Sequence, residues 1–214
     1  YQLLSHLRME GKYFYVDSNF ELNSHVHVIF TLENGKRLLY QDTRKFGTYH
    51  LYDKAIDLET TAPFQVLGLE PFATEFTPSY VKEKIQNKKK PIKSLLLDQT
   101  VVCGLGNIYV DEVLYRARLH PLTSSSELTD KDIENVVKYT VEVLARAIEL
   151  GGTTIRTFSS SHGVSGTFQN ELLVHQRKGE NCYECHTPIE KIKVGGRGTY
   201  FCPTCQKLTV KEMK

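Results

Sequence analysis

The chain has 214 residues, of which 40% are hydrophobic and 24% charged, and its formal net charge is +2. This composition is typical of a globular protein of one or two domains and argues against a disordered or fibrous chain. The sequence contains neither a run of about 20 apolar residues, as a membrane helix needs, nor a signal peptide pattern at its start. Residues 1–75 carry 7 Lys and Arg against 10 Asp and Glu, whereas the remainder carries 20 against 15. The basic excess in the later part weakly indicates an anionic partner there.

An antiparallel β region is predicted for residues 1–52. The segments GKYFYV, HVHVIFTL and RLLY alternate or run apolar, and Asn34-Gly35 predicts a tight hairpin turn between the last two. A stretch containing proline, residues 60–78, then changes the pattern and indicates a domain connection.

Three helices are predicted after this connection. The first starts at Pro78 and runs into the lysines at 88–90, the second covers IKSLLLDQ, and the third begins after Gly104-Leu105-Gly106. Proline is favoured in the first turn of a helix, and glycine turns commonly precede one.

The clearest helical pattern covers residues 130–150. Thr129 and Asp132 form a capping box, and Gly151 ends the helix. The predicted apolar stripe consists of Ile133, Val136, Val137, Thr140, Leu144, Ala147 and Ile148. Residues 151–170 are rich in Gly, Ser and Thr, which predicts a mobile loop.

Four of the five cysteines have the spacing of a metal site. Cys182-x2-Cys185 and Cys202-x2-Cys205 are separated by 16 residues, which predicts one structural Zn²⁺ held by four thiolates. The alternative is two disulfides or buried thiols. Cys103 is left over and is interpreted as a small buried residue or a spacer before a helix, with a reactive thiol as the alternative. A zinc–thiolate site with an odd cysteine indicates a reducing, cytoplasmic setting.

Two glycine-rich segments are candidate phosphate sites. Asn107 follows the glycine turn and is expected to cap the helix there, whose free N–H groups and dipole attract anions. Lys93 and the lysines at 88–90 precede this turn and are candidates to bind a backbone phosphate together with it. The alternatives are a plain capped helix for the glycine turn and a solvated run for the lysines at 88–90. The segment KVGGRGT, midway between the cysteine pairs, predicts a hairpin whose tip carries Arg197. The alternative is a flexible tip with an exposed arginine.

Taken in order, these motifs strongly resemble the bacterial formamidopyrimidine-DNA glycosylases. The resemblance rests on LLSHLRMEGKY, QDTRKFG, LLLDQTVVCGLGNIYVDEVLYRARLHP, GGTTIRTF and GGRGTYFCPTCQ, and covers nearly the whole chain. It implies an α+β fold with an antiparallel β-sandwich, a helix–two-turn–helix domain and a zinc finger. The corresponding boundaries are 1–72 for the partial sandwich, 73–150 for the helical domain, 151–172 for a lesion-capping loop and 173–207 for the finger.

The resemblance also implies a function. Members of this family excise oxidised purines, such as 8-oxoguanine and formamidopyrimidines, and then cleave the abasic strand by β,δ-elimination. The implied partner is double-stranded DNA that contains oxidised bases or abasic sites. A monomer in the bacterial cytoplasm, associated with the nucleoid when bound to DNA, is expected, with no membrane partner.

Individual residues take roles from this resemblance. Asn107 is similar to the family's phosphate contact, and Arg197 to the zinc-finger arginine that binds phosphates beside the lesion and assists δ-elimination. Met9, Arg44 and Phe46 match the trio that fills the hole left by an extruded base. Lys88 falls near a DNA-binding lysine of the family, and Lys93 is the second candidate for that role. His25 and Arg44 match further DNA-binding positions.

The sequence departs from the family pattern in two places. Family members begin Pro-Glu, where the proline amine is the nucleophile and the glutamate transfers protons. This sequence instead starts at Tyr1. The expectation is therefore that the complete protein is a glycosylase and lyase, and that this chain alone binds DNA without cutting it. The family's Tyr-Gly-Arg before the cysteines reads His175-Gln176-Arg177 here, which changes one lesion-side contact. The alternatives are an endonuclease VIII-like enzyme for oxidised pyrimidines and a non-catalytic module that binds damaged DNA.

Overall fold

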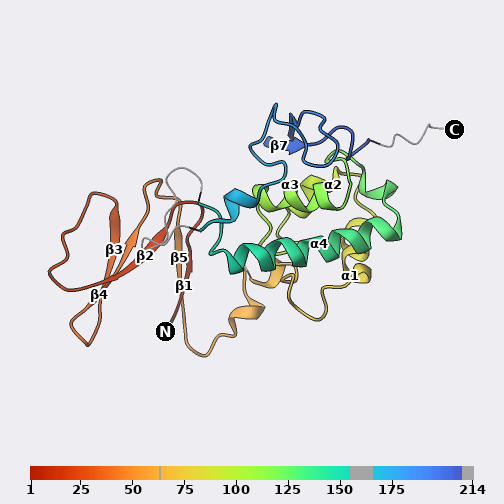
Figure 1. Cartoon of the computed structure of the whole chain (residues 1–214). Helices are drawn as coiled ribbons and strands as arrows, with labels where there is room; N and C mark the ends of the chain where they lie inside the picture. Colours follow the sequence, from red (N-terminus) through yellow and green to blue (C-terminus); the bar gives the residue numbers. More distant parts are fainter. Residues whose placement is uncertain (63, 155–165, 209–214) are drawn as a thin grey trace. The chain divides into compact units, whose positions relative to one another are not determined.

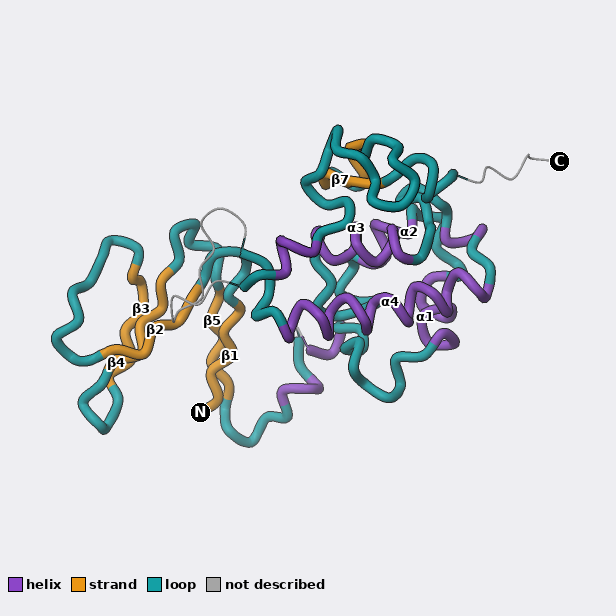
Figure 2. Tube along the Cα trace, in the orientation of Figure 1, coloured by secondary structure: helices purple, strands orange, loops and turns teal. Residues whose placement is uncertain are grey.

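The computed structural model describes residues 1–62, 64–154 and 166–208. The chain forms two compact units, one of residues 1–61 with 151–169 and one of residues 62–150 with 170–214 (Figures 1 and 2). Among the described residues, no helix is both long and apolar enough to cross a membrane.

The first unit contains two antiparallel sheets. In one, β1 pairs with β5; in the other, β4 lies between β2 and β3. The strands are β1 (Gln2–His6), β2 (Lys12–Val16), β3 (Val26–Thr31), β4 (Arg37–Gln41) and β5 (Thr48–Tyr52). The predicted antiparallel region is confirmed, and so is the turn between β3 and β4, where Gly35 has a φ of 77°. The strand β5 was not singled out in the sequence, because TYHLY shows no clean alternation.

Tyrosines connect the two sheets of the first unit. The hydroxyl oxygen of Tyr13 on β2 lies within hydrogen-bond distance of two hydroxyls, that of Ser5 on β1 at 2.7 Å and that of Tyr49 on β5 at 2.8 Å. The ring of Tyr40 lies 5.4 Å from that of Tyr13 and 5.3 Å from that of Tyr49, between ring centroids. Such tilted and edge-to-face contacts stabilise aromatic clusters. The cluster therefore fixes the end of β4, from which the DTRKFG segment leaves.

Within the described residues, the second unit contains four α-helices. These are α1 (Pro78–Ile85), α2 (Ile92–Leu96), α3 (Asn107–Arg116) and α4 (Asp130–Glu149), and α4 packs against both α1 and α3. Two predicted ends were wrong, since α1 stops before the lysine run and α2 stops before Leu97. Pro91 disfavours helical backbone in the residue before it, which separates the two helices. After α2, Asp98 accepts hydrogen bonds from the backbone and hydroxyl of Thr100, which stabilises a turn instead of further helix.

The long helix α4 has the predicted capping box but a different buried face. Thr129 accepts from the backbone of Asp132, whose carboxylate accepts from the backbone of Thr129. The buried residues are Ile133, Val136, Thr140, Val143 and Ala147. This set follows alternating steps of three and four, so Val143 belongs to the stripe, and Ile148, which is 68% exposed, does not.

The finger closes the second unit. Strands β6 (Glu190–Val194) and β7 (Arg197–Phe201) form a hairpin, and β7 packs on α3. Gly195 and Gly196 have φ values of 54° and 79°, the left-handed conformation that a two-residue hairpin turn needs. Short 3-10 helices occur at Leu58–Thr60, Phe64–Val66, Ser125–Glu127 and Phe168–Glu171.

Candidate nucleic-acid interface

The four paired cysteines form a thiolate cluster in the second unit. All four Sγ atoms lie within 4.8 Å of one another, and none of these cysteines is in a disulfide. The Sγ–Sγ distances are 3.9 Å for Cys182 and Cys205 and 3.3 Å for Cys185 and Cys202. A Zn–S bond of about 2.3 Å gives tetrahedral edges of about 3.8 Å, so the cluster fits one Zn²⁺ with no open position. Cys103 is partly buried and lies outside the cluster.

Helix α3 and the residues that follow it contact this cluster. The hydroxyl of Tyr115, which is buried, lies 3.2 Å from Sγ of Cys182. The side-chain amide of Gln206 donates to the carbonyl of Leu119 at 2.9 Å, and its oxygen accepts from the backbone of Cys202 at 2.9 Å. The second cysteine pair is thereby fixed to the end of the α3 region by a buried side chain that the sequence analysis did not identify.

Asn107 lies where α3 begins, but it does not cap the helix. The N-cap is Gly106, and Asn107 is the first helical residue. Its amide nitrogen instead donates to the carbonyl of Gly198 on β7 at 3.0 Å, and its Oδ1 is buried with no hydrogen-bond partner among the described residues. The expected N-cap was therefore wrong, because the side chain reaches across to the finger rather than back to its own helix.

Lys93 is buried, which contradicts the expectation that it contacts a DNA phosphate. Its ammonium lies 2.6 Å from Oδ1 of Asp111 on α3, and both side chains are 0% exposed. The same ammonium donates to the carbonyl of Gly198 at 3.3 Å. Burial lowers the pKa of Lys93, with Asp111 acting in the opposite direction.

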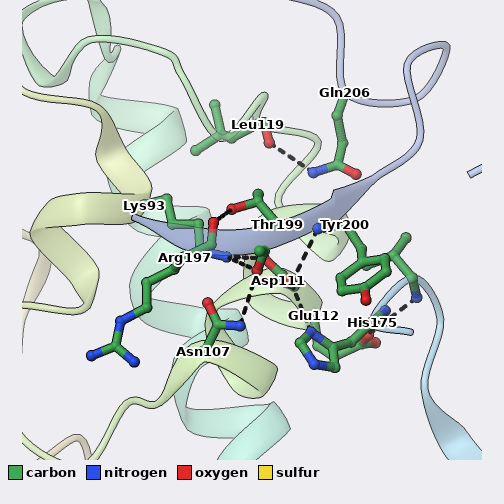
Figure 3. A network of polar contacts seen from close by, with 12 residues as sticks. Lys93, Asn107, Asp111, Glu112, Leu119, His175, Arg197, Thr199, Tyr200 and Gln206 are labelled. Carbon is green, nitrogen blue, oxygen red and sulfur yellow. Dashed lines mark hydrogen bonds and ion pairs between the residues drawn. The ribbon is translucent and has the colours of Figure 1, made fainter. Parts of the chain in front are cut away.

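Asp111 is the centre of a wider buried network (Figure 3). Its Oδ2 lies 2.7 Å from Nδ1 of His175 and accepts from the backbone of Tyr200 on β7 at 3.2 Å. One carboxylate therefore joins α2, α3, the segment at 175 and the finger hairpin. The sequence analysis missed it, because its partners lie far from it along the chain.

The neighbouring Glu112 fixes the segment that leads into the finger. It is 1% exposed and accepts from the backbones of three successive residues, Leu173, Val174 and His175, at 2.8 to 3.1 Å. Burial raises the pKa of Glu112, while the three hydrogen bonds lower it. The only sequence signal for these two acids was their place within the GNIYVDE run.

The side chain of Arg197 is exposed, at the first position of β7. Figure 3 shows its guanidinium pointing away from the buried network, and no hydrogen bond or ion pair of this group is found within the described ranges. Lys88 lies after α1 and is partly buried, and its carbonyl accepts from the hydroxyl of Ser125. Lys89 and Lys90 are exposed.

In the first unit, Met9, Arg44 and Phe46 form one exposed cluster. The guanidinium of Arg44 lies 4.8 Å from the ring centroid of Phe46, and its Nη1 lies 3.4 Å from Sδ of Met9. Met9 is 63% exposed and Phe46 is 56% exposed. Large apolar side chains with this exposure at a loop tip are not part of a core, so the structure favours a surface role.

Beneath this cluster lies Asp42, a site residue that the sequence analysis did not identify. Its buried carboxylate accepts from the backbones of Arg44, Phe46 and Gly47 and from the hydroxyl of Tyr40, at 2.9 to 3.0 Å. Burial acts to raise the pKa of Asp42, but the four hydrogen bonds outweigh it and lower the pKa to about 2. Its signal is an aspartate two residues before Arg44, the spacing of an Asx turn.

Gly47 and His25 complete the surroundings of Asp42. A Cβ on Gly47 would lie 1.7 Å from the hydroxyl oxygen of Tyr40, so only glycine lets this hydroxyl reach the carboxylate. His25 is exposed, and its carbonyl accepts from the backbone of Asp42 at 3.0 Å. Of the predicted loop over the lesion, residues 155–165 lie outside the described part of the chain.

Comparisons with known proteins agree with this geometry. Residues 1–49 match the formamidopyrimidine-DNA glycosylase N-terminal domain, residues 67–159 its H2TH domain, and residues 179–208 the zinc finger found in FPG and IleRS. The chain belongs to the formamidopyrimidine-DNA glycosylase family. The formamidopyrimidine-DNA glycosylase of Bacillus licheniformis is 48% identical over 205 residues, which cover 96% of this chain and 74% of that protein. That of Exiguobacterium sibiricum is 49% identical and covers 98% and 76%, respectively.

Solved structures of this glycosylase family share the fold. A complex of a Lactococcus lactis FPG variant with Fapy-dG containing DNA is 42% identical, with a TM-score of 0.86, and covers 96% of this chain and 74% of that chain. A complex of Lactococcus lactis Fpg with DNA that contains an abasic site is 43% identical, with a TM-score of 0.85 and the same coverage. The α+β fold class with a terminal zinc finger is therefore confirmed.

Proposed function

We propose that the protein acts in base-excision repair, as a glycosylase that removes oxidised purines from DNA and as a lyase that cleaves the abasic strand. The observation that carries this proposal is the exposed cluster of Met9, Arg44 and Phe46 on a loop fixed by Asp42. The family relationship and the relatives solved with Fapy-dG or abasic-site DNA support it.

The cluster has the chemistry needed to replace an extruded base. Flipping a base out of a duplex costs a few kcal/mol of stacking and pairing. An apolar wedge such as Phe46 offsets part of this cost by filling the gap, and a guanidinium such as that of Arg44 donates hydrogen bonds to the orphaned base. The fixed loop means that little conformational entropy is lost on insertion.

On the second unit, Arg197 and Asn107 are assigned to the DNA backbone. The guanidinium of Arg197 is a planar donor that matches a phosphate bidentately, and its exposure leaves it available. Beside the lesion it neutralises the phosphate that departs in the final elimination. A structural Zn²⁺ on the four cysteines holds the finger that presents Arg197. Lys88 and His25 are assigned as further phosphate contacts, whereas buried Lys93 acts within the protein.

The purine enzyme is favoured over the endonuclease VIII-like alternative. The relatives and neighbours described above carry the name formamidopyrimidine-DNA glycosylase or FPG, and the Arg44-Lys45-Phe46 motif agrees with them. Such an enzyme would work as a monomer in the bacterial cytoplasm, on nucleoid DNA.

Binding to short duplexes tests the proposal. Fluorescence anisotropy should give tighter binding to a duplex with a tetrahydrofuran abasic analogue than to the undamaged duplex. Affinity for both should fall steeply with salt, because phosphate contacts release counterions. Base release from an 8-oxoguanine duplex is measured on the full gene product that contains this chain. Equal affinity for damaged and undamaged DNA, together with no release of 8-oxoguanine, would refute the proposed function.

A further inference from the structure

We infer that Asp111 is a positioning residue for Arg197, acting through the backbone of the finger hairpin; this inference rests on the proposed function. Lys93 and His175 are the two buried groups that hold Asp111 in place. Neither Asp111 nor Lys93 reaches solvent, so neither contacts DNA in this arrangement.

The contacts hold the strand directly after the residue that presents the guanidinium. Gly198, directly after Arg197, offers its carbonyl to the ammonium of Lys93 and to the amide of Asn107, at 3.3 and 3.0 Å. Two residues further along β7, the backbone of Tyr200 donates to Asp111 at 3.2 Å. The strand that starts with Arg197 is thus attached to α2 and α3 at two successive points.

The turn of the hairpin adds a third restraint. Gly195 has a φ of 54°, and a Cβ there would lie 3.1 Å from the hydroxyl of Ser94 on α2. The tip therefore lies close against α2, next to Lys93. A side chain that must meet one phosphate gains affinity when its backbone is fixed before binding.

His175 connects Asp111 to the segment before the finger. Its Nδ1 lies 2.7 Å from Asp111, and its ring packs edge-on against Tyr200, with 4.9 Å between ring centroids. The same residue donates its backbone N–H to Glu112. The position of β7 is consequently coupled to residues on three different segments, all through one carboxylate.

The sign of the effect separates positioning from simple electrostatics. Asp111→Asn removes one negative charge, which by long-range attraction alone would strengthen binding to DNA. If Asp111 positions Arg197, the same change must weaken binding, since an amide has one acceptor oxygen and cannot accept from Lys93 on one side and from the backbone of Tyr200 on the other. The two explanations therefore predict opposite directions.

A double-mutant cycle provides the test, measured by anisotropy on the abasic-analogue duplex. We expect Arg197→Ala to weaken binding about tenfold and to lower the slope of log K against log salt by about one. Asp111→Asn should weaken binding at least about threefold with a similar fall in slope, but less than about 1.5-fold when Arg197 is already alanine. Thr140→Val, which changes a buried polar residue of α4 outside this network, is the control and should leave affinity unchanged.

Several outcomes would overturn the inference. They are stronger binding by Asp111→Asn, no change, or an equal loss in both backgrounds, which would indicate general damage to the fold. If Asp111→Asn loses zinc or fails to fold, His175→Phe replaces it, because it keeps the ring against Tyr200 and removes one donor to Asp111. It should give at least an about twofold loss that depends on Arg197. If the unchanged chain shows no preference for the damaged duplex and 8-oxoguanine is not released, the proposed function fails instead.

Discussion

Replacing Asp42 with asparagine should destabilise the loop that presents Arg44 and Phe46. The carboxylate accepts four hydrogen bonds while it is only 1% exposed. An amide in its place offers one acceptor oxygen and turns a donor toward backbone N–H groups that need acceptors. The change therefore leaves buried donors unsatisfied as well as removing the charge.

The size of the effect follows from the pKa of Asp42. A fall from 3.8 to about 2 means that the folded loop prefers the ionised form by about 2 kcal/mol. This agrees with the usual cost of losing hydrogen bonds to a charged group, about 1.5 to 3 kcal/mol. Because the folded pKa is depressed, this stabilisation is complete above pH 3.8 and is lost as the pH falls toward about 2. Asp42→Asn should therefore also remove this part of the acid dependence.

Hydrogen exchange of the peptide that spans residues 40–50 measures this locally. An effect of about 2 kcal/mol corresponds to exchange that is about thirtyfold faster at Arg44, Phe46 and Gly47. Asp53→Asn is the matched control, since Asp53 accepts from Ala55 in a similar turn at 2.9 Å but is exposed, and it should change exchange by less than about twofold. A change below about twofold for Asp42→Asn in a folded protein would refute the reasoning.

Three further predictions concern the finger and the wedge. A strong chelator, or Cys185→Ser, should release about one zinc per chain and unfold the finger before the helices, as followed by a colorimetric zinc assay and circular dichroism; a finger that stays folded without metal would contradict the assigned site. Gln176→Gly should raise the melting temperature. The φ of 65° destabilises a non-glycine residue by about 1 to 2 kcal/mol, and the greater entropy of glycine in the unfolded chain cancels only about half of the gain from removing this strain. A lower melting temperature would show that the side chain of Gln176 contributes stabilising contacts. Phe46→Ala should weaken binding to the abasic-analogue duplex about tenfold and leave undamaged DNA unchanged, with the fluorescence of an adjacent 2-aminopurine as the direct report of insertion; an equal loss on both duplexes would argue against a wedge.

Local sequence signals predicted the elements whose causes are local. The capping box of Thr129 and Asp132 located the start of α4, the glycine turns located both hairpins, and the cysteine spacing located the thiolate cluster. In each case a few neighbouring residues determine the backbone. The end of α1 and the place of Ile148 were missed, because they depend on Pro91 and on the rotation of α4 against its neighbours.

The candidate site was also predicted only in part from the sequence. Met9, Arg44 and Phe46 were identified through the family resemblance, but the carboxylate beneath them was not. Asp42 belongs to no apolar pattern, its one local signal is the Asx-turn spacing before Arg44, and its four donors converge only once β4 and the following loop are formed. Buried acceptors of this kind are visible in a structure and are easily overlooked in a sequence.

Lys93 shows why a basic residue near a phosphate site is not necessarily a phosphate contact. It lies in a short helix between Ile92 and Leu95, both of which are buried, so the surroundings of the helix rather than its charge decide where the ammonium lies. Removing one partner of a buried ion pair typically costs about 3 to 5 kcal/mol, because the other charge is left uncompensated. Substitution of Lys93 would thus disturb Asp111 and the hairpin behind Arg197, and DNA binding would fall without any direct contact being lost. Weaker binding by such a variant therefore cannot assign Lys93 to DNA, whereas its dependence on Arg197 can assign it to the hairpin.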